Sequence, residues 1–158
     1  AKRNNVPTIL NPAPAVTLLD EVYGLCDYFT PNETEASFLA GIPVETTEQA
    51  SEAAQIFIEH GVKTAVITLG ENGVYVQNSE ISQHVPAFNM GDKVLETTGA
   101  GDAFNGGFAY ALAEGMELTE AVSYGSATAA ISVTRLGTAP AMPYKTEIQE
   151  LLDSEKNL

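Results

Sequence analysis

The chain has 158 residues, which is enough for one domain with a buried core, and 44% of them are hydrophobic, as in folded globular proteins. The formal net charge of −14 argues against a nucleic acid or an anionic membrane surface as partner, because phosphate groups would be repelled. With a single cysteine, no apolar run of membrane-spanning length and no signal-peptide pattern, we expect a cytoplasmic protein.

The first half of the chain predicts strands that alternate with helices. After the end of a basic helix comes a short strand over 7–10 and a proline-rich loop. Apolar spacing and glycine stops predict a helix over 33–40 and a longer one over 47–61. A nearly continuous β-branched run predicts a buried strand over 62–70, and two short strands follow over 73–78 and 82–88.

The second half is predicted to be helical. A glycine-rich segment opens a helix that ends at about Glu114, and further helices follow over 117–137 and 142–152. Strands that alternate with helices imply an α/β fold, with a parallel sheet that carries helices on its faces. With no repeat and no internal linker, we expect residues 1–158 to form a single domain.

The stretch "TGAGDAF" places glycines directly before a helix. Consecutive backbone N–H groups and the helix dipole make such a turn suitable for a phosphate or a developing oxyanion. Asp102 lies at the same helix start, where negative charge is favoured, so its carboxylate could accept a proton from an attacking hydroxyl. The structural alternative makes Asp102 an ordinary N-cap. Neither the dinucleotide fingerprint nor a Walker loop fits these letters.

The stretch "TLGENG", residues 68–73, ends the predicted buried strand. Ligands of open α/β sheets gather at the carboxyl ends of strands, and glycines let a ligand approach the backbone. A tight hairpin turn explains the same letters, and both interpretations remain open.

The stretch "TPNETEA" places Asn32 and Glu35 three residues apart at a helix start. This spacing is close to that of a capping box. The functional alternative is a metal and phosphate site in which Glu35 holds Mg²⁺ through water, and the two roles are compatible.

Five stretches in one order resemble the C-terminal half of the ribokinases, in the PfkB family of carbohydrate and nucleoside kinases. They are "ILNPAPA", "TPNETEA", "ITLGENGV", "TTGAGDAFNGGF" and "AAISVTRLGTAPAMP", and the resemblance runs almost end to end. It implies a ribokinase-like three-layer α/β/α fold with a mostly parallel sheet, here truncated at the N-terminus. The sugar-binding N-terminal half and its lid would then be absent.

The resemblance also implies roles for individual residues. Asp102 matches the family's catalytic base, and the N–H groups of Gly99, Ala100 and Gly101 match its anion hole. Gly106 and Gly107 are expected to let this helix approach the sheet. The positions that match ATP contacts are Asn32, Thr68, Leu69, Gly70, Glu71, Asn72, Gly73, Gly101, Asp102 and Ser126.

Two cations are implied in addition to ATP. Glu35 matches a carboxylate associated with Mg²⁺. The positions that match a K⁺ site are Glu96, Thr98, Ser132, Arg135, Gly137 and Ala141. The family usually has Asp where Glu96 stands, so an extra methylene shifts this carboxylate and leaves K⁺ activation open.

The implied function is ATP-dependent phosphoryl transfer to a sugar hydroxyl, with D-ribose as the expected acceptor. A fructokinase-like or adenosine-kinase-like substrate is the alternative within the family. A non-catalytic nucleotide-binding fragment is the alternative of another class, because the sugar-binding half is missing. The expected partners are the sugar and ATP, with no nucleic acid and no membrane, and a homodimer is left open.

Overall fold

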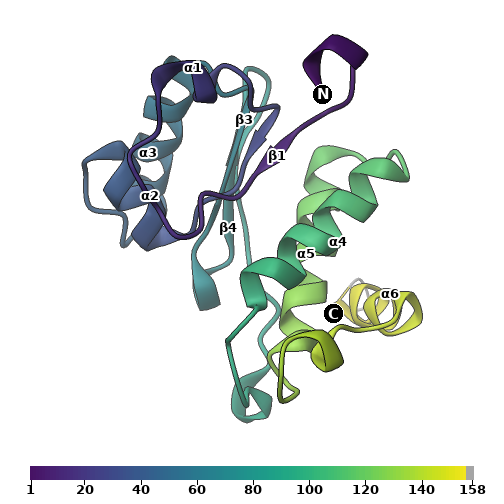
Figure 1. Ribbon diagram of the computed structural model, residues 1–158. Coiled ribbons are helices and arrows are strands. Elements are labelled where there is room, and N and C mark those ends of the chain that lie inside the picture. Colours follow the sequence, from purple (N-terminus) through teal and green to yellow (C-terminus); the bar gives the residue numbers. More distant parts are fainter. Residues whose placement is uncertain (156–158) are drawn as a thin grey trace. The chain divides into compact units, whose positions relative to one another are not determined.

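A computed structural model describes residues 1–155 of the chain (Figure 1). Two compact units divide the chain at residues 85 and 86, Ala1–Val85 and Pro86–Leu158. In the described residues, no helix is long and apolar enough to cross a membrane. The expectation of a single domain over 1–158 stays a prediction.

The first unit is built on a sheet of five strands in the order β1-β2-β3-β4-β5. The strands are β1 (Ile9–Leu10), β2 (Tyr28–Phe29), β3 (Thr64–Thr68), β4 (Val74–Gln77) and β5 (Ser82–Val85). The first three pair in parallel, and β4 is antiparallel to both β3 and β5. Four strands therefore run in one direction and only β4 reverses, so the sheet is mostly parallel as expected.

Helices α1 (Asp20–Tyr23), α2 (Glu33–Ala40) and α3 (Thr47–Glu59) lie together on one side of this sheet (Figure 1). Ala50, Ala53, Ala54 and Phe57 form the buried face of α3, at the helical spacing seen in the sequence. The Phe57 ring meets Phe29 of β2 edge to face, with ring centroids 5.0 Å apart. This aromatic contact joins the helical layer to the sheet.

The 3-10 helices and some element boundaries differ from the sequence prediction. The expected basic helix is the 3-10 turn η1 (Lys2–Asn4), and a second 3-10 turn, η2 (Gly70–Asn72), connects β3 to β4. Helix α1 and strand β2 were not predicted. The span of α2 and the presence of β3, β4 and β5 are confirmed.

The described part of the second unit, residues 86–155, contains three α-helices and two 3-10 turns. These are η3 (Gly91–Lys93), α4 (Ala100–Ala113), α5 (Leu118–Ser132), η4 (Ala139–Ala141) and α6 (Lys145–Glu155). The predicted helix over 117–137 ends earlier, at Ser132, and the last helix begins at Lys145 instead of residue 142. The first of these helices is thus shorter than predicted and the last one is displaced by three residues toward the C-terminus, which is the usual error of boundaries drawn from a pattern.

Glycines bring α4 and α5 close together. A Cβ at Gly107 would lie 2.2 Å from Thr128 Oγ1 and 3.2 Å from the Cα of Gly125. A Cβ at Gly125 would in turn lie 2.9 Å from the carbonyl oxygen of Phe104. Gly107 is therefore a packing position as expected, but the element that it contacts is α5. A Cβ at Gly106 would meet no atom within 4 Å, so nothing within the second unit requires glycine there and the packing role expected for Gly106 stays a prediction.

Candidate active site

The first turn of α4 places the predicted base at an open helix N-terminus. The N-cap is Gly99, whose φ of 82° lies in the left-handed region that favours glycine. No side chain caps the helix, and Asp102 is its third residue with an exposed side chain. The interpretation of Asp102 as an N-cap is therefore wrong, because the chain enters the helix at Gly99.

Backbone donors accompany Asp102 in this turn. The N–H of Ala100 donates to the carbonyl oxygen of Thr97 at 3.1 Å. Within residues 1–155 the N–H groups of Gly101 and Asp102 have no acceptor, as is usual for the first turn of a helix. A Cβ at Gly101 would meet nothing within 4 Å, so this part of the turn is open. The turn can thus present free donors and a carboxylate to one ligand.

The segment 68–73 forms the turn between β3 and β4. Leu69 N–H donates to the carbonyl of Gly73 at 2.7 Å, and Gly73 N–H donates to the carbonyl of Gly70 at 3.2 Å. Gly70 and Gly73 both have positive φ, 54° and 94°. The hairpin-turn interpretation is confirmed, since the strands are antiparallel neighbours. Glu71 and Asn72 are exposed at the tip, and a nucleotide-binding role for the segment stays a prediction.

The capping box at the start of α2 is also confirmed. Asn32 Oδ1 accepts from the N–H of Glu35, and Glu35 Oε2 accepts from the N–H of Asn32, both at 2.9 Å. Asn32 forms a parallel bridge to Thr68, so α2 begins beside the end of β3. A Cβ at Gly70 would lie 3.3 Å from Glu33 Oε1. The structure therefore brings the predicted contacts at residues 32, 68 and 70 together within the first unit.

Glu35 fits an indirect role toward Mg²⁺. Its side chain is buried and one carboxylate oxygen is used by the capping box, so Oε1 remains for a metal-bound water. Among the described residues, no group of three His, Cys, Asp or Glu side chains could hold a metal ion by itself. Mg²⁺ takes most of its ligands from water and substrate phosphates, so a role of Glu35 toward Mg²⁺ stays a prediction.

Two residues of the predicted K⁺ site are in contact in the second unit. Glu96 Oε2 accepts from the N–H of Gly137 at 2.9 Å, although 41 positions separate them. The segments that contain them are also joined by the carbonyl of Val133, which accepts from Leu95 N–H and Glu96 N–H at 2.8 and 3.2 Å. The longer glutamate side chain thus binds backbone, and its second oxygen remains for a cation.

The other residues of the predicted K⁺ site form hydrogen bonds with other groups or are exposed. Arg135 N–H donates to the carbonyl of Ser132, and the Arg135 guanidinium donates to both carboxylate oxygens of Glu147. The Ser132 hydroxyl donates to the carbonyl of Ala129. Ala141 N–H donates to the carbonyl of Thr138 within η4, and Thr98 is exposed. Carbonyl oxygens in this region are the kind of ligand that suits K⁺, but several already accept hydrogen bonds.

Ser126, one of the predicted nucleotide contacts, lies in an unusual environment for a serine. Its side chain is buried on α5, and its hydroxyl oxygen has no hydrogen-bond partner in the described residues. Buried hydroxyls are nearly always hydrogen-bonded, so an unpartnered one suits a polar atom of a ligand.

One contact of the turn at 70–72 was missed by sequence reasoning, which left His84 without a role. The His84 Nε2 atom is hydrogen-bonded to the carbonyl oxygen of Asn72. In β5, His84 pairs with Tyr75, which places its ring near the turn. The alternation of side chains along β5 could have indicated this contact of His84 only if the pairing of β4 with β5 had been known.

The comparison with protein families decides which kind of protein this is. The model of the pfkB family of carbohydrate kinases matches residues 1–145, which include the turn at 68–73 and the glycine-rich start of α4. The chain belongs to the PfkB family of carbohydrate kinases. The family resemblance noted in the sequence is confirmed.

Relatives in this family include ribokinases. The chain is 44% identical over 153 residues to the ribokinase of Haemophilus influenzae, covering 97% of this chain and 49% of that protein. It is 37% identical over 152 residues to a deoxyribokinase of Salmonella typhi, covering 96% of this chain and 49% of that one. The chain corresponds to the C-terminal half of its relatives and spans about half of their length.

Solved PfkB structures confirm the fold. The ribokinase of Thermotoga maritima superposes with a TM-score of 0.85 and 42% identity, over 96% of this chain and 50% of that one. The Arabidopsis thaliana ribokinase complexed with ribose and ATP gives a TM-score of 0.90 and 34% identity, over 96% and 49%. The α/β ribokinase-like fold predicted from the sequence is therefore correct.

Proposed function

We propose that this chain is the nucleotide-binding and catalytic-base half of a kinase that transfers the γ-phosphoryl group of ATP to a hydroxyl of D-ribose. The observation that carries the proposal is the first turn of α4, where unpaired N–H groups and the exposed Asp102 carboxylate share one helix start. Family membership supports the reaction class, and similarity to a ribokinase complexed with ribose and ATP supports the substrates.

In the proposed reaction Asp102 takes the proton of the sugar hydroxyl. The hydroxyl oxygen then attacks the γ-phosphorus in line, and the bond between that phosphorus and the bridging oxygen of ADP breaks. The N–H groups at the start of α4, with that of Gly101 the most open, donate to the phosphoryl oxygens as charge develops there. Positioning and charge stabilisation supply most of the rate enhancement.

The remaining predicted residues would bind the nucleotide and its cations. The turn at 68–73 with Asn32 would hold phosphate and nucleoside groups, and the Ser126 hydroxyl would bond to the base. Glu35 would orient a water of Mg²⁺, which when bound neutralises negative charge on the phosphates. The carboxylate of Glu96 and carbonyls near Gly137 would hold K⁺.

A second candidate is a nucleotide-binding fragment without catalytic activity. The observation that favours it is that the chain spans about half of the length of its relatives. A fructokinase-like or adenosine-kinase-like acceptor is the alternative within the kinase class. We also propose that residues 1–158 form a single domain and that the protein is cytoplasmic. A homodimer is compatible with this proposal.

A thermal-melt titration with Mg·ATP, with and without D-ribose, tests nucleotide and sugar binding. A ligand that binds only the folded state stabilises it by RT ln(1 + [L]/Kd), so ATP at 100 times Kd should add about 2.7 kcal/mol. A shift with ATP and a further shift with ribose support the kinase. A shift with ATP alone indicates an intact nucleotide-binding half without its sugar site, and no shift with either ligand contradicts both candidates.

The Asp102→Asn variant tests the catalytic base. In a kinase that also contains the N-terminal half, ribose-dependent ADP release should fall by about 10²- to 10⁴-fold, as expected for loss of a general base, while the ATP-induced melting shift stays close to that of the parent. Glu80→Gln, a neutralisation in the exposed turn between β4 and β5, controls for a change of net charge. A loss under threefold in Asp102→Asn would remove the proposed role.

A further inference from the structure

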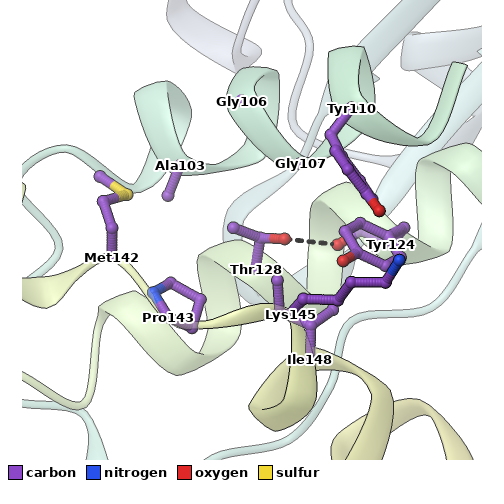
Figure 2. Close-up of a pocket in the computed structure, with 10 residues that line it drawn as sticks. All are labelled: Ala103, Gly106, Gly107, Tyr110, Tyr124, Thr128, Met142, Pro143, Lys145 and Ile148. Carbon is purple, nitrogen blue, oxygen red and sulfur yellow. Dashed lines mark hydrogen bonds between the residues drawn. The ribbon is translucent and has the colours of Figure 1, made fainter. Parts of the chain in front are cut away.

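Ten residues of the second unit line a pocket that includes none of the site residues predicted from the sequence (Figure 2). Residues of α4, α5 and the segment 142–148 form its walls. Its volume is about 250 Å³. Since a cavity of about 150 Å³ can hold benzene, this pocket has room for an aromatic ring and one further group.

One end of the pocket carries a positive charge and two phenol rings. Lys145 Nζ lies 5.3 Å from the centroid of the Tyr110 ring, and the Tyr110 and Tyr124 rings lie 5.4 Å apart. Figure 2 shows the Lys145 nitrogen and the hydroxyl oxygens of Tyr110 and Tyr124 on the same side of the pocket. A carboxylate oxygen of Glu114 lies 3.9 Å from Nζ, and both side chains are at least half exposed. So loose a surface pair is worth little, and the ammonium can bind a ligand anion instead.

The rest of the pocket is apolar or already satisfied. Figure 2 shows Ala103, Met142 and Pro143 on the side away from Lys145. The Thr128 hydroxyl donates to the carbonyl of Tyr124 at 2.8 Å, so it is not needed by a ligand. Gly106 leaves open space on α4 where any other residue would place a Cβ. A flat apolar group can therefore lie directly against this helix.

We propose that this pocket binds a small aromatic anion, with its ring against α4 at Gly106 and its anionic group on Lys145. In a chain with only seven Lys and Arg residues and a net charge of −14, such a cation is a distinctive point of attraction for an anion. The site is separate from Ser126, which is two residues from both Tyr124 and Thr128 and so points to the opposite side of α5. The proposal does not depend on the proposed kinase function.

Benzoate, with benzamide as its neutral counterpart, is the probe that tests the proposal. In ¹H–¹⁵N correlation spectra of the whole chain, benzoate should shift the amide signals of Gly106 and Gly107 saturably. Benzamide should bind about three- to fivefold more weakly, as expected for one exposed ion pair. Equal affinities, or no saturable shift at these two signals, would overturn the proposal.

Four variants locate the site. Lys145→Met should abolish the preference for benzoate over benzamide, whereas Lys93→Met, on η3 outside the pocket, should keep it. Gly106→Leu should fill the pocket and weaken both probes at least about tenfold, whereas Ala109→Leu, exposed on α4 but not lining the pocket, should bind both unchanged. Both leucine variants should fold, because each side chain enters open space. If Lys145→Met keeps the preference, or Ala109→Leu weakens binding as much as Gly106→Leu, the assignment is wrong.

Discussion

The buried hydroxyl of Ser126, which has no hydrogen-bond partner in the described residues, destabilises the ligand-free protein, and a hydrogen bond to a ligand would offset this penalty. An unsatisfied buried polar group costs about 1–3 kcal/mol, and this oxygen has no partner within residues 1–155. We expect Ser126→Ala to raise the free energy of unfolding by up to about 1 kcal/mol, or about 2–4 °C in melting temperature, without ligand. The same variant should show a smaller Mg·ATP-induced shift than the parent.

Ser123→Ala is the matched control for this prediction. Ser123 lies on the same helix, and its hydroxyl donates to the carbonyl of Thr119 at 3.0 Å. Its removal should leave the Mg·ATP-induced shift unchanged. If Ser126→Ala instead lowers the melting temperature and keeps the full ATP shift, the hydroxyl is a structural group and its role in nucleotide binding is refuted.

Single residues differ in how far the sequence could place them. The contact between Asn32 and Glu35 could be predicted, because a capping box is a local pattern that spans four consecutive residues. The contact between Glu96 and Gly137 was suggested only by family resemblance, since no local rule connects residues 41 positions apart. The missing partner of Ser126 could not be predicted at all, because burial depends on how α5 packs.

At the scale of elements, we expect the substitution of alanine at two adjacent glycines of α4 to change the free energy of unfolding in opposite directions. At Gly107 a new methyl would meet Thr128 Cβ at 2.8 Å and Oγ1 at 2.2 Å, so α4 and α5 would have to separate. We expect Gly107→Ala to lower the free energy of unfolding by about 1–3 kcal/mol through overpacking. Gly106→Ala meets nothing and should raise it by up to about 1 kcal/mol, through helix propensity alone.

Urea denaturation of both variants measures this difference, and a double variant checks its cause. Thr128→Ala removes Oγ1 and the γ-methyl, so Gly107→Ala combined with Thr128→Ala should be less destabilised than the sum of the two single changes. Additive losses, or equal effects at positions 106 and 107, would contradict the close packing of α4 on α5.

Elements were predictable where they are long and periodic. The bounds of α2 and the buried face of α3 follow from apolar spacing, caps and glycine stops. Helix α1 and strand β2 were missed, because four and two residues are too few to show a period. The reversal at β4 is set by the tight turn at 70–72, and the sequence left that turn open between a hairpin and a ligand site.

At the scale of the whole chain, two carboxylates link stability to pH, one in each unit. The Lys63 ammonium, which donates to Asp27, holds the pKa of that carboxyl below its ordinary value, and Thr8 N–H and Oγ1 bond to the same group. The Arg135 guanidinium holds the pKa of Glu147 below its ordinary value in the same way. In the unfolded chain both groups take up protons at about pH 4. Their stabilisation is therefore complete above that pH and is lost as the pH falls through the lowered values of the folded state.

Asp27→Asn and Glu147→Gln test this linkage and the single-domain prediction together. Both should lower the melting temperature at pH 7. For Asp27→Asn the free energy of unfolding should fall by about 1–2 kcal/mol, because the substitution weakens hydrogen bonds to a charged group. Both should differ less from the parent near pH 3, where the parent carboxyls approach protonation. If residues 1–158 form one cooperative domain, calorimetry shows one transition whose midpoint either substitution lowers. Two transitions, of which Asp27→Asn shifts one and Glu147→Gln the other, would mean that the units Ala1–Val85 and Pro86–Leu158 unfold independently and that the single-domain prediction is wrong.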